Sequence, residues 1–139
     1  MCAHNLRVRW AEVDMQKIVF NGHYLTYIDT AIAEYWREIG LPYPEGYLER
    51  FGNDIYLRKA TLEYLGSARY DDELAVCCRV ARLGRSSMTF QFEIYRQARV
   101  LITAELVYVN ADPSTMKAAP LPEELRERVR KYERVAPQA

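Results

Sequence analysis

The chain has few cysteines and no long apolar run, and both absences exclude classes of protein. Three cysteines among 139 residues cannot build the disulfide framework of a small secreted domain. Cys77 and Cys78 are neighbours in a segment with strand character, so their side chains should point to opposite faces and should not pair. No stretch approaches the length of a membrane span, and the first residues lack the apolar core of a signal peptide. We therefore expect a soluble cytoplasmic protein without a membrane span.

An excess of one charge is absent as well. Lysine plus arginine and aspartate plus glutamate both number 19, so no overall field attracts nucleic acid or an anionic membrane. An anionic ligand must then be held by a local cluster of basic groups. The two histidines, His4 and His23, lack partners at metal-ligand spacing, which predicts no metal site. A glycine-rich phosphate loop and a serine-centred nucleophile elbow are also missing.

The length and the 50% hydrophobic content suit a single domain over residues 1–139 with one continuous core. Residues 6–10 alternate apolar and basic side chains, which predicts a strand. Asn21 is a good N-cap for a long helix that should run to about Ile39, and Gly40 can adopt the left-handed conformation that ends it. The apolar positions of this helix recur at three- and four-residue spacing and should be buried: Tyr24, Tyr27, Ile28, Ala31, Tyr35 and Ile39.

The second half of the chain changes to a two-residue period. Four strands rich in β-branched and aromatic residues are predicted over 55–65, 74–80, 88–95 and 100–110, the last three joined by short turns into an antiparallel meander. A short helix should follow within 122–134. One long helix cannot cover both faces of a five-stranded sheet, so the sheet should curve around it. Apolar side chains on the other face predict that a partner covers it: Leu101, Val107 and Val109.

The segment between the first strand and the helix carries the chemistry. Asp14 lies seven residues before the helix start, across a loop that contains the apolar run Ile18-Val19-Phe20. The helix start offers the positive end of its dipole and unpaired backbone N–H groups, those of Gly22, His23 and Tyr24. These groups suit a developing oxyanion, and a loop carboxylate can attack a carbonyl group or activate water beside it. A thioester needs little acid assistance because a thiolate is a good leaving group.

This segment resembles the signature of the hotdog acyl-CoA thioesterases, which include hydroxybenzoyl-CoA thioesterase and the Tol-Pal-associated acyl-CoA thioesterases. The matching string is Asp14, then Ile18-Val19-Phe20-Asn21, then Tyr24-Leu25. Similarity continues in the same order over 64–74, 82–88 and 107–110, so it spans nearly the whole chain. The resemblance implies an α+β hotdog fold, in which a five-stranded antiparallel sheet wraps one long central helix and a short C-terminal helix follows.

The resemblance also implies roles for individual residues. Asp14 would be the nucleophile or general base, and Asn21 with the first helical N–H groups would polarise the carbonyl group. Two groups would bind the substrate: the loop and strand residues Ile18, Val19, Phe20, Glu63 and Tyr64, and the turn residues Arg82, Gly84, Arg85 and Ser86. That turn suits the phosphates of CoA because it combines arginines with hydroxyl and N–H groups. The family usually builds each site from two subunits, which predicts a homodimer, a homotetramer of paired dimers, and no cofactor besides the CoA of the substrate.

Two departures from the family pattern leave other functions open. Lys17 stands where the family commonly has glycine, and Asn21 and His23 stand where some members have histidine and asparagine in the reverse order. A hotdog hydratase or dehydratase acting on acyl thioesters would pair Asp14 with His23, and replacing His23 should then abolish activity. A non-catalytic acyl-CoA or acyl-carrier binding protein would bind the ligand without releasing a thiol.

Overall fold

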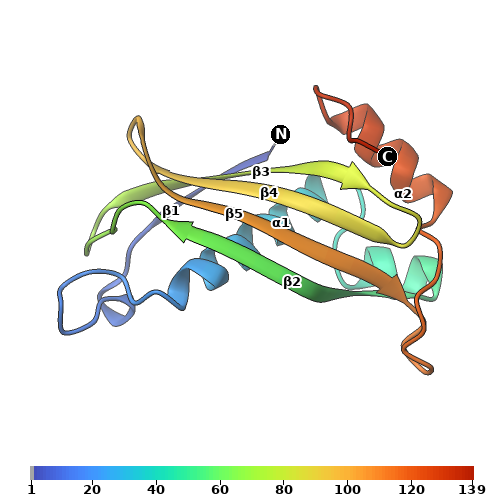
Figure 1. Cartoon of the computed structure of the whole chain (residues 1–139), viewed down its shortest axis with the longest axis horizontal. Helices are drawn as coiled ribbons and strands as arrows, with labels where there is room; N and C mark the ends of the chain where they lie inside the picture. The colour runs from blue at the N-terminus through green and yellow to red at the C-terminus, as the bar shows by residue number, and fades with distance from the viewer. Residues whose placement is uncertain (1) are drawn as a thin grey trace.

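Within residues 2–139, which the computed structural model describes, five strands and two α-helices follow one another in the predicted order (Figure 1). In chain order the elements are β1 (Cys2–Arg7), the 3₁₀ turn η1 (Trp10–Glu12), α1 (His23–Glu38), the π-helical turn η2 (Glu45–Glu49), β2 (Asp54–Tyr64), β3 (Glu73–Leu83), β4 (Ser87–Arg96), β5 (Arg99–Ala111) and α2 (Glu123–Tyr132). The periodicities predict neither η1 nor η2, because each is shorter than two helical turns.

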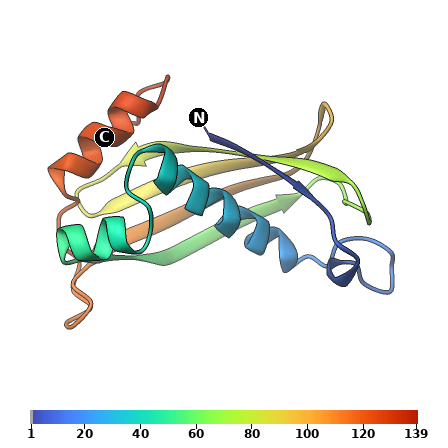
Figure 2. The same ribbon diagram turned by 180° about the vertical axis from the view of Figure 1, so that it is seen from behind.

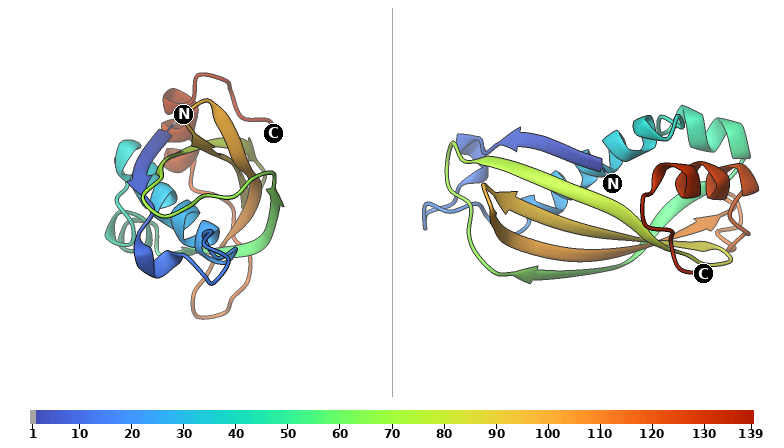
Figure 3. Two further views of the ribbon diagram at one scale, coloured as in Figure 1. Left: turned by 90° about the vertical axis from the view of Figure 1, so that its left-hand side faces the viewer. Right: turned by 90° about the horizontal axis from the view of Figure 1, so that it is seen from above.

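All five strands belong to one antiparallel sheet with the order β1-β3-β4-β5-β2. Tight turns join β3 to β4 and β4 to β5, which confirms the predicted meander. β1 and β2 occupy the two edges of the sheet. The sheet curls around α1, as the end-on view in Figure 3 shows. The predicted hotdog fold, with one long helix inside a curved five-stranded sheet and a short C-terminal helix, is therefore confirmed.

One face of α1 is buried against the concave side of the sheet (Figure 2). Every predicted core position is buried: Tyr24, Tyr27, Ile28, Ala31, Tyr35 and Ile39. Ile32 and Trp36 are buried as well, so the apolar stripe is wider than predicted. Tyr35 and Trp36 both contact Phe90 of β4 edge to face. Because large apolar side chains contribute about 1.5–3 kcal/mol each when fully buried, tertiary packing holds the helix in place.

The first strand differs from its predicted position. β1 ends at Arg7, and Trp10 begins η1 with 72% of its surface exposed. Val8 is buried just beyond the strand, and its N–H group donates to the carbonyl oxygen of Asp72. The alternation of apolar and basic residues therefore indicates burial correctly at Val8, but it places the strand too late in the chain.

The outer face of the sheet is more polar than predicted. Leu101 is fully buried because the segment after β2 packs on it, and Leu65 and Gly66 of that segment donate their N–H groups to its carbonyl oxygen. The expectation that Leu101 faces a partner is therefore wrong, and Val107 and Val109 are both partly buried. Polar side chains line a depression on this face: Lys59, Thr61, Glu63, Arg79, Gln91, Glu93, Thr103 and Glu105. Cys77 lies on the same face while Cys78 is buried on the other, as predicted.

The C-terminal segment covers the part of β3 that β1 leaves unpaired. The buried carboxylate of Glu133 accepts hydrogen bonds from the Tyr35 hydroxyl group at 2.6 Å and from the Val80 N–H group at 2.8 Å. Gln138 continues this contact, since its N–H group donates to the carbonyl oxygen of Ala81. No helix within residues 2–139 is long and apolar enough to cross a membrane.

We expect Gly40→Ala to lower the free energy of unfolding more than Gly52→Ala does. Both glycines have a positive φ, at 80° and 72°, where a Cβ atom costs about 1–2 kcal/mol. Only at Gly40 would the new Cβ lie 2.6 Å from Nη1 of Arg128, which donates to the carbonyl oxygen of Ile39 at the end of α1. Urea unfolding of both variants measures the difference, and equal losses would contradict a role for Arg128 as the cap of α1.

Candidate active site

The loop that carries Asp14 is a short hairpin. Val13 and Val19 form an antiparallel bridge at its base, and the N–H group of Asp14 donates to the carbonyl oxygen of Ile18 at 3.0 Å. The N–H group of Lys17 donates back to the carbonyl oxygen of Asp14 at 2.9 Å. The Asp14 carboxylate accepts the N–H group of Gln16 at 2.8 Å, which fixes one of its oxygens and leaves the other for a ligand.

Lys17 adopts a φ of 64° in this hairpin. Glycine reaches the left-handed region without steric cost, whereas a residue with a Cβ atom rarely does. The family's usual glycine therefore suits this backbone position, and the departure to lysine is accommodated without opening the hairpin. The lysine side chain is exposed.

The chain enters α1 through a turn rather than through a side-chain cap. Gly22 is the N-cap residue with helical dihedral angles, and no side chain caps it, so the predicted N-cap role of Asn21 is wrong. The carbonyl oxygen of Asn21 instead accepts the Tyr64 hydroxyl group at 3.4 Å. The N–H group of His23 donates to the carbonyl oxygen of Phe20 at 2.9 Å and is thereby used within the turn.

Two of the three predicted backbone donors at the start of α1 stay available to a ligand. Among the described residues, the N–H groups of Gly22 and Tyr24 have no hydrogen-bond acceptor in the protein. They lie at the positive end of the dipole of a 16-residue helix, where a negative charge is stabilised. The three predicted donors are therefore reduced to two.

One pocket of about 320 Å³ brings Asp14 and the start of α1 together. Seven of the predicted site residues line it: Asp14, Ile18, Val19, Phe20, Asn21, Tyr24 and Tyr64. Gln16, Gly66 and Ser67 complete the lining and are absent from the predicted site. Gly66 and Ser67 belong to the stretch that resembles the family, so that stretch is the signal by which they could have been found.

Two tyrosines, Tyr24 of α1 and Tyr64 of β2, line this pocket. Burial raises the pKa of the Tyr24 hydroxyl group, although the Ala68 N–H group that donates to its oxygen acts in the opposite direction. Tyr64 of β2 lies edge to face with Tyr24, at 5.8 Å between ring centroids. Val19 donates its N–H group to the carbonyl oxygen of Ala68. Hydrogen bonds through Ala68 thus hold α1, the Asp14 hairpin and the segment after β2 together around the pocket.

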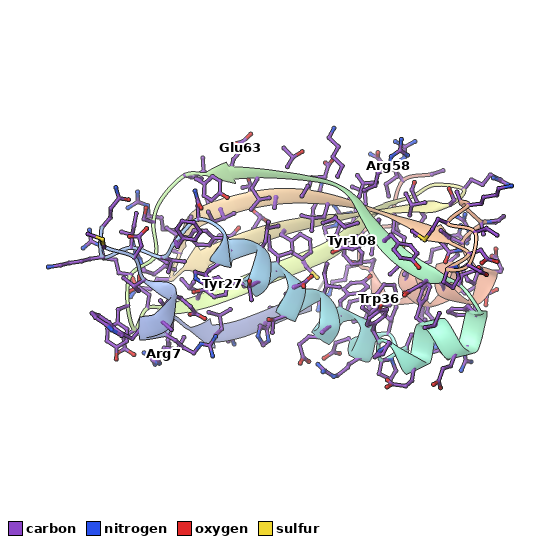
Figure 4. All side chains as sticks on the ribbon, turned by 90° about the horizontal axis from the view of Figure 1, so that it is seen from below. Arg7, Tyr27, Trp36, Arg58, Glu63 and Tyr108 are labelled. Carbon is purple, nitrogen blue, oxygen red and sulfur yellow. The ribbon has the colours of Figure 1, made fainter. Side chains whose placement is uncertain are left out.

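The remaining predicted site residues lie outside this pocket. Gly22 and His23 flank it, and the His23 ring contacts the edge of Phe20. Glu63 lies on the side of β2 away from α1 and lines the depression on the outer sheet face (Figure 4). It misses the pocket because neighbouring residues of a strand point to opposite faces, and Tyr64 takes the inner one.

The turn between β3 and β4 lies at one end of the sheet, and the loop between η1 and α1, which carries Asp14, lies at the other (Figure 1). β3 has 11 residues, so Arg82, Gly84, Arg85 and Ser86 are separated from the pocket by roughly 35 Å of strand. Arg126 of α2 donates to the carbonyl oxygens of Gly84 and Arg85, which adds a third guanidinium group that sequence reasoning missed. Within a single chain, the predicted phosphate-binding turn and Asp14 are not brought together.

Comparison with known proteins agrees with this fold. Residues 16–103 match the model of the thioesterase superfamily, and the chain belongs to that family. It is 27% identical over 121 residues to the acyl-CoA thioester hydrolase YbgC of Escherichia coli O6:H1, covering 86% of this chain and 89% of that protein. A hypothetical protein of Aquifex aeolicus has a similar structure, with a TM-score of 0.84 and 26% identity over 91% of this chain and 98% of that one. The DHNA-CoA thioesterase of Staphylococcus aureus shares the fold, with a TM-score of 0.85 and 20% identity over 94% and 89% of the two chains.

We expect Lys17→Gly to raise the free energy of unfolding by about 0.5–1 kcal/mol, because it relieves the positive φ at this position. Lys17→Ala removes the same charge but keeps a Cβ atom, so it serves as the matched control and should change stability little. Chemical denaturation of the two variants measures the effect. A gain that is equal in both variants would show that charge, and not backbone conformation, sets the energy of the hairpin.

Proposed function

We propose that the protein hydrolyses an acyl-CoA thioester to a free carboxylic acid and CoA, with the Asp14 carboxylate acting at the thioester carbonyl group. The observation that carries the proposal is that Asp14 and the start of α1 line one pocket. Membership of the thioesterase superfamily and similarity to an acyl-CoA thioester hydrolase support the substrate class.

The pocket suggests how the residues divide the reaction. The thioester oxygen would accept the N–H groups of Gly22 and Tyr24, whose acceptors are missing within the described chain. Negative charge that develops on this oxygen is then stabilised by the donors and by the helix dipole. The Asp14 carboxylate would attack the carbonyl carbon or take a proton from a water molecule that attacks it. The C–S bond breaks, its electron pair leaves with the thiolate of CoA, and water supplies the oxygen of the acid.

The arginine-rich turn is a candidate for the phosphates of CoA. Arg82 and Arg85 are exposed there, and Arg126 lies against the backbone of the same turn. Guanidinium groups form charge-assisted, bidentate hydrogen bonds with phosphates. Within one chain, this turn and Asp14 lie at opposite ends of the sheet. We therefore propose that the turn binds the phosphates of the CoA whose thioester occupies the pocket of a second copy.

The free edge of β2 supports a homodimer that would place the turn in this way. β2 ends the sheet, and residues 57–61 are exposed along it. Unpaired strand edges readily pair with another chain. Antiparallel pairing of two β2 strands about Thr61 would set Lys59 of each copy opposite Glu63 of the other. The two-fold axis of such a pair reverses the strand direction, so the turn of one copy reaches the end of the sheet where the other copy holds Asp14. Association of two dimers into a homotetramer stays a prediction.

We expect Asp14→Asn to reduce the rate of thiol release from acyl-CoA by at least about 100-fold, since the amide is neither a base nor a nucleophile. The matched control is Asp112→Asn. Asp112 is another loop aspartate whose carboxylate accepts the N–H group two residues later, that of Ser114 at 2.8 Å. The measurement is thiol release from short, long and aromatic acyl-CoAs.

Three outcomes would count against the proposal. Nearly full activity in Asp14→Asn would contradict the role of this carboxylate. Binding of acyl-CoA by the native protein without any thiol release would favour the non-catalytic alternative. Reversible addition of water to an unsaturated acyl-CoA, abolished by replacing His23, would favour the hydratase alternative.

We expect Lys59→Glu or Glu63→Lys alone to weaken the dimer about tenfold, because like charges would then face each other at two symmetric positions. The double reversal, Lys59→Glu with Glu63→Lys, restores opposite charges and should restore the native dissociation constant. Sedimentation equilibrium measures the three variants against the native protein. Unchanged association in both single variants would exclude pairing about Thr61.

A further inference from the structure

A buried carboxylate lies at the base of the hairpin that carries Asp14. Glu12 is 5% exposed and is one of three buried polar or charged residues among the described part of the chain, with Asn110 and Glu133. A buried charge is unfavourable unless hydrogen bonds and an opposite charge satisfy it. The contacts of Glu12 therefore indicate what its burial achieves.

Both carboxylate oxygens of Glu12 are fully used. One accepts the backbone N–H group of Arg9 at 2.8 Å and the hydroxyl group of Tyr27 at 2.9 Å. The other accepts Nε of Arg9 at 2.9 Å and lies 2.8 Å from Nη2 of the same guanidinium group. Burial would raise the pKa of Glu12, but the hydrogen bonds from Arg9 and Tyr27 and the charge of Arg9 together hold it below its ordinary value.

These contacts join three segments at the candidate active site: η1, the hairpin that carries Asp14, and α1. The carbonyl oxygen of Glu12 accepts the N–H group of Phe20, just after the hairpin returns from Asp14. Tyr27 lies one helical turn beyond His23, on the face of α1 that packs in the core (Figure 4). Glu12 thus connects the base of the hairpin to Tyr27 of α1, which follows Tyr24 by three residues and Gly22 by five. Asp14 itself has no hydrogen bond to α1 among the described residues.

We propose that Glu12 is a positioning residue that, through Tyr27, sets the separation between the Asp14 carboxylate and the start of α1. This inference rests on the proposed thioester hydrolysis and names a residue that acts through others. Glu12 touches neither pocket nor substrate, since it is absent from the pocket lining. Displacement of a reacting group by about 1 Å can cost 100-fold in rate. Loss of the hydrogen bond between Glu12 and Tyr27 should therefore lower turnover more than substrate binding.

The chain contains a matched pair for comparison. Glu133 is also a buried carboxylate that accepts the hydroxyl group of a tyrosine on α1, Tyr35 at 2.6 Å. This second pair lies toward the opposite end of the helix, where Glu133 also accepts the N–H group of Val80 in β3. Tyr27→Phe and Tyr35→Phe therefore remove the same hydroxyl group, from the same helix and from the same kind of partner, at the two ends of α1.

The test compares these variants by steady-state thiol release, unfolding free energy and amide hydrogen exchange of residues 13–20. We expect Tyr27→Phe to lower kcat about tenfold and Glu12→Gln to lower it about 10- to 100-fold, with KM changed less than about twofold. Exchange of the hairpin amides should accelerate in both. Tyr35→Phe should lose comparable stability while kcat and the exchange of residues 13–20 stay as in the native protein.

Several results would overturn the inference. Native kcat and native hairpin exchange in Tyr27→Phe, or equal loss of kcat in Tyr27→Phe and Tyr35→Phe, would leave only a general structural role for Glu12. If Glu12→Gln does not fold, Tyr27→Phe decides the question alone. A failure of the proposed function looks different, because Asp14→Asn would then keep its rate or the native protein would release no thiol. The exchange measurements would still test whether Glu12 and Tyr27 hold the hairpin in place.

Discussion

The packing of α1 against the concave face of the sheet is the constraint on which the rest of the structure depends. A wide apolar stripe fixes the rotation of the helix, and its aromatic side chains fix its position along the strands. Once the helix is held in this way, the place of its N-terminus is determined. Tyr24 and Tyr27 then link the buried core to the segments around the pocket, because their hydroxyl groups form hydrogen bonds with Ala68 and Glu12.

Local placement of charge compensates for the absence of a net charge. The chain sets a carboxylate near the positive end of α1 and gathers guanidinium groups at the opposite end of the sheet. An antiparallel pair of subunits would bring these two ends together, so that one neutral chain could offer both a reacting carboxylate and a site for phosphates. The polar outer face and the self-complementary charges of β2 are consistent with association through the strand edge.

The sequence predicts the elements better than it predicts their mutual placement. The spacing of Tyr24, Ile28 and Tyr35 reveals the helix because a buried stripe leaves a periodic pattern. The contact of Glu12 with Tyr27 leaves no such pattern, since the two residues are 15 positions apart and meet only in the folded chain. Resemblance to the family indicates both Asp14 and Tyr64. The side of the sheet to which Glu63 points could not be predicted in this way, because it depends on the register of β2, which only the folded sheet defines.

The central claim is that Asp14 and the start of α1 act on the same carbonyl group. A crystal structure of the native protein with an acyl-CoA analogue whose thioester is replaced by a ketone tests this directly. We expect the ketone oxygen to accept the N–H group of Gly22 or Tyr24 while the Asp14 carboxylate faces the carbonyl carbon. A ketone bound with its oxygen away from α1, or with Asp14 turned to solvent beyond contact, would contradict it.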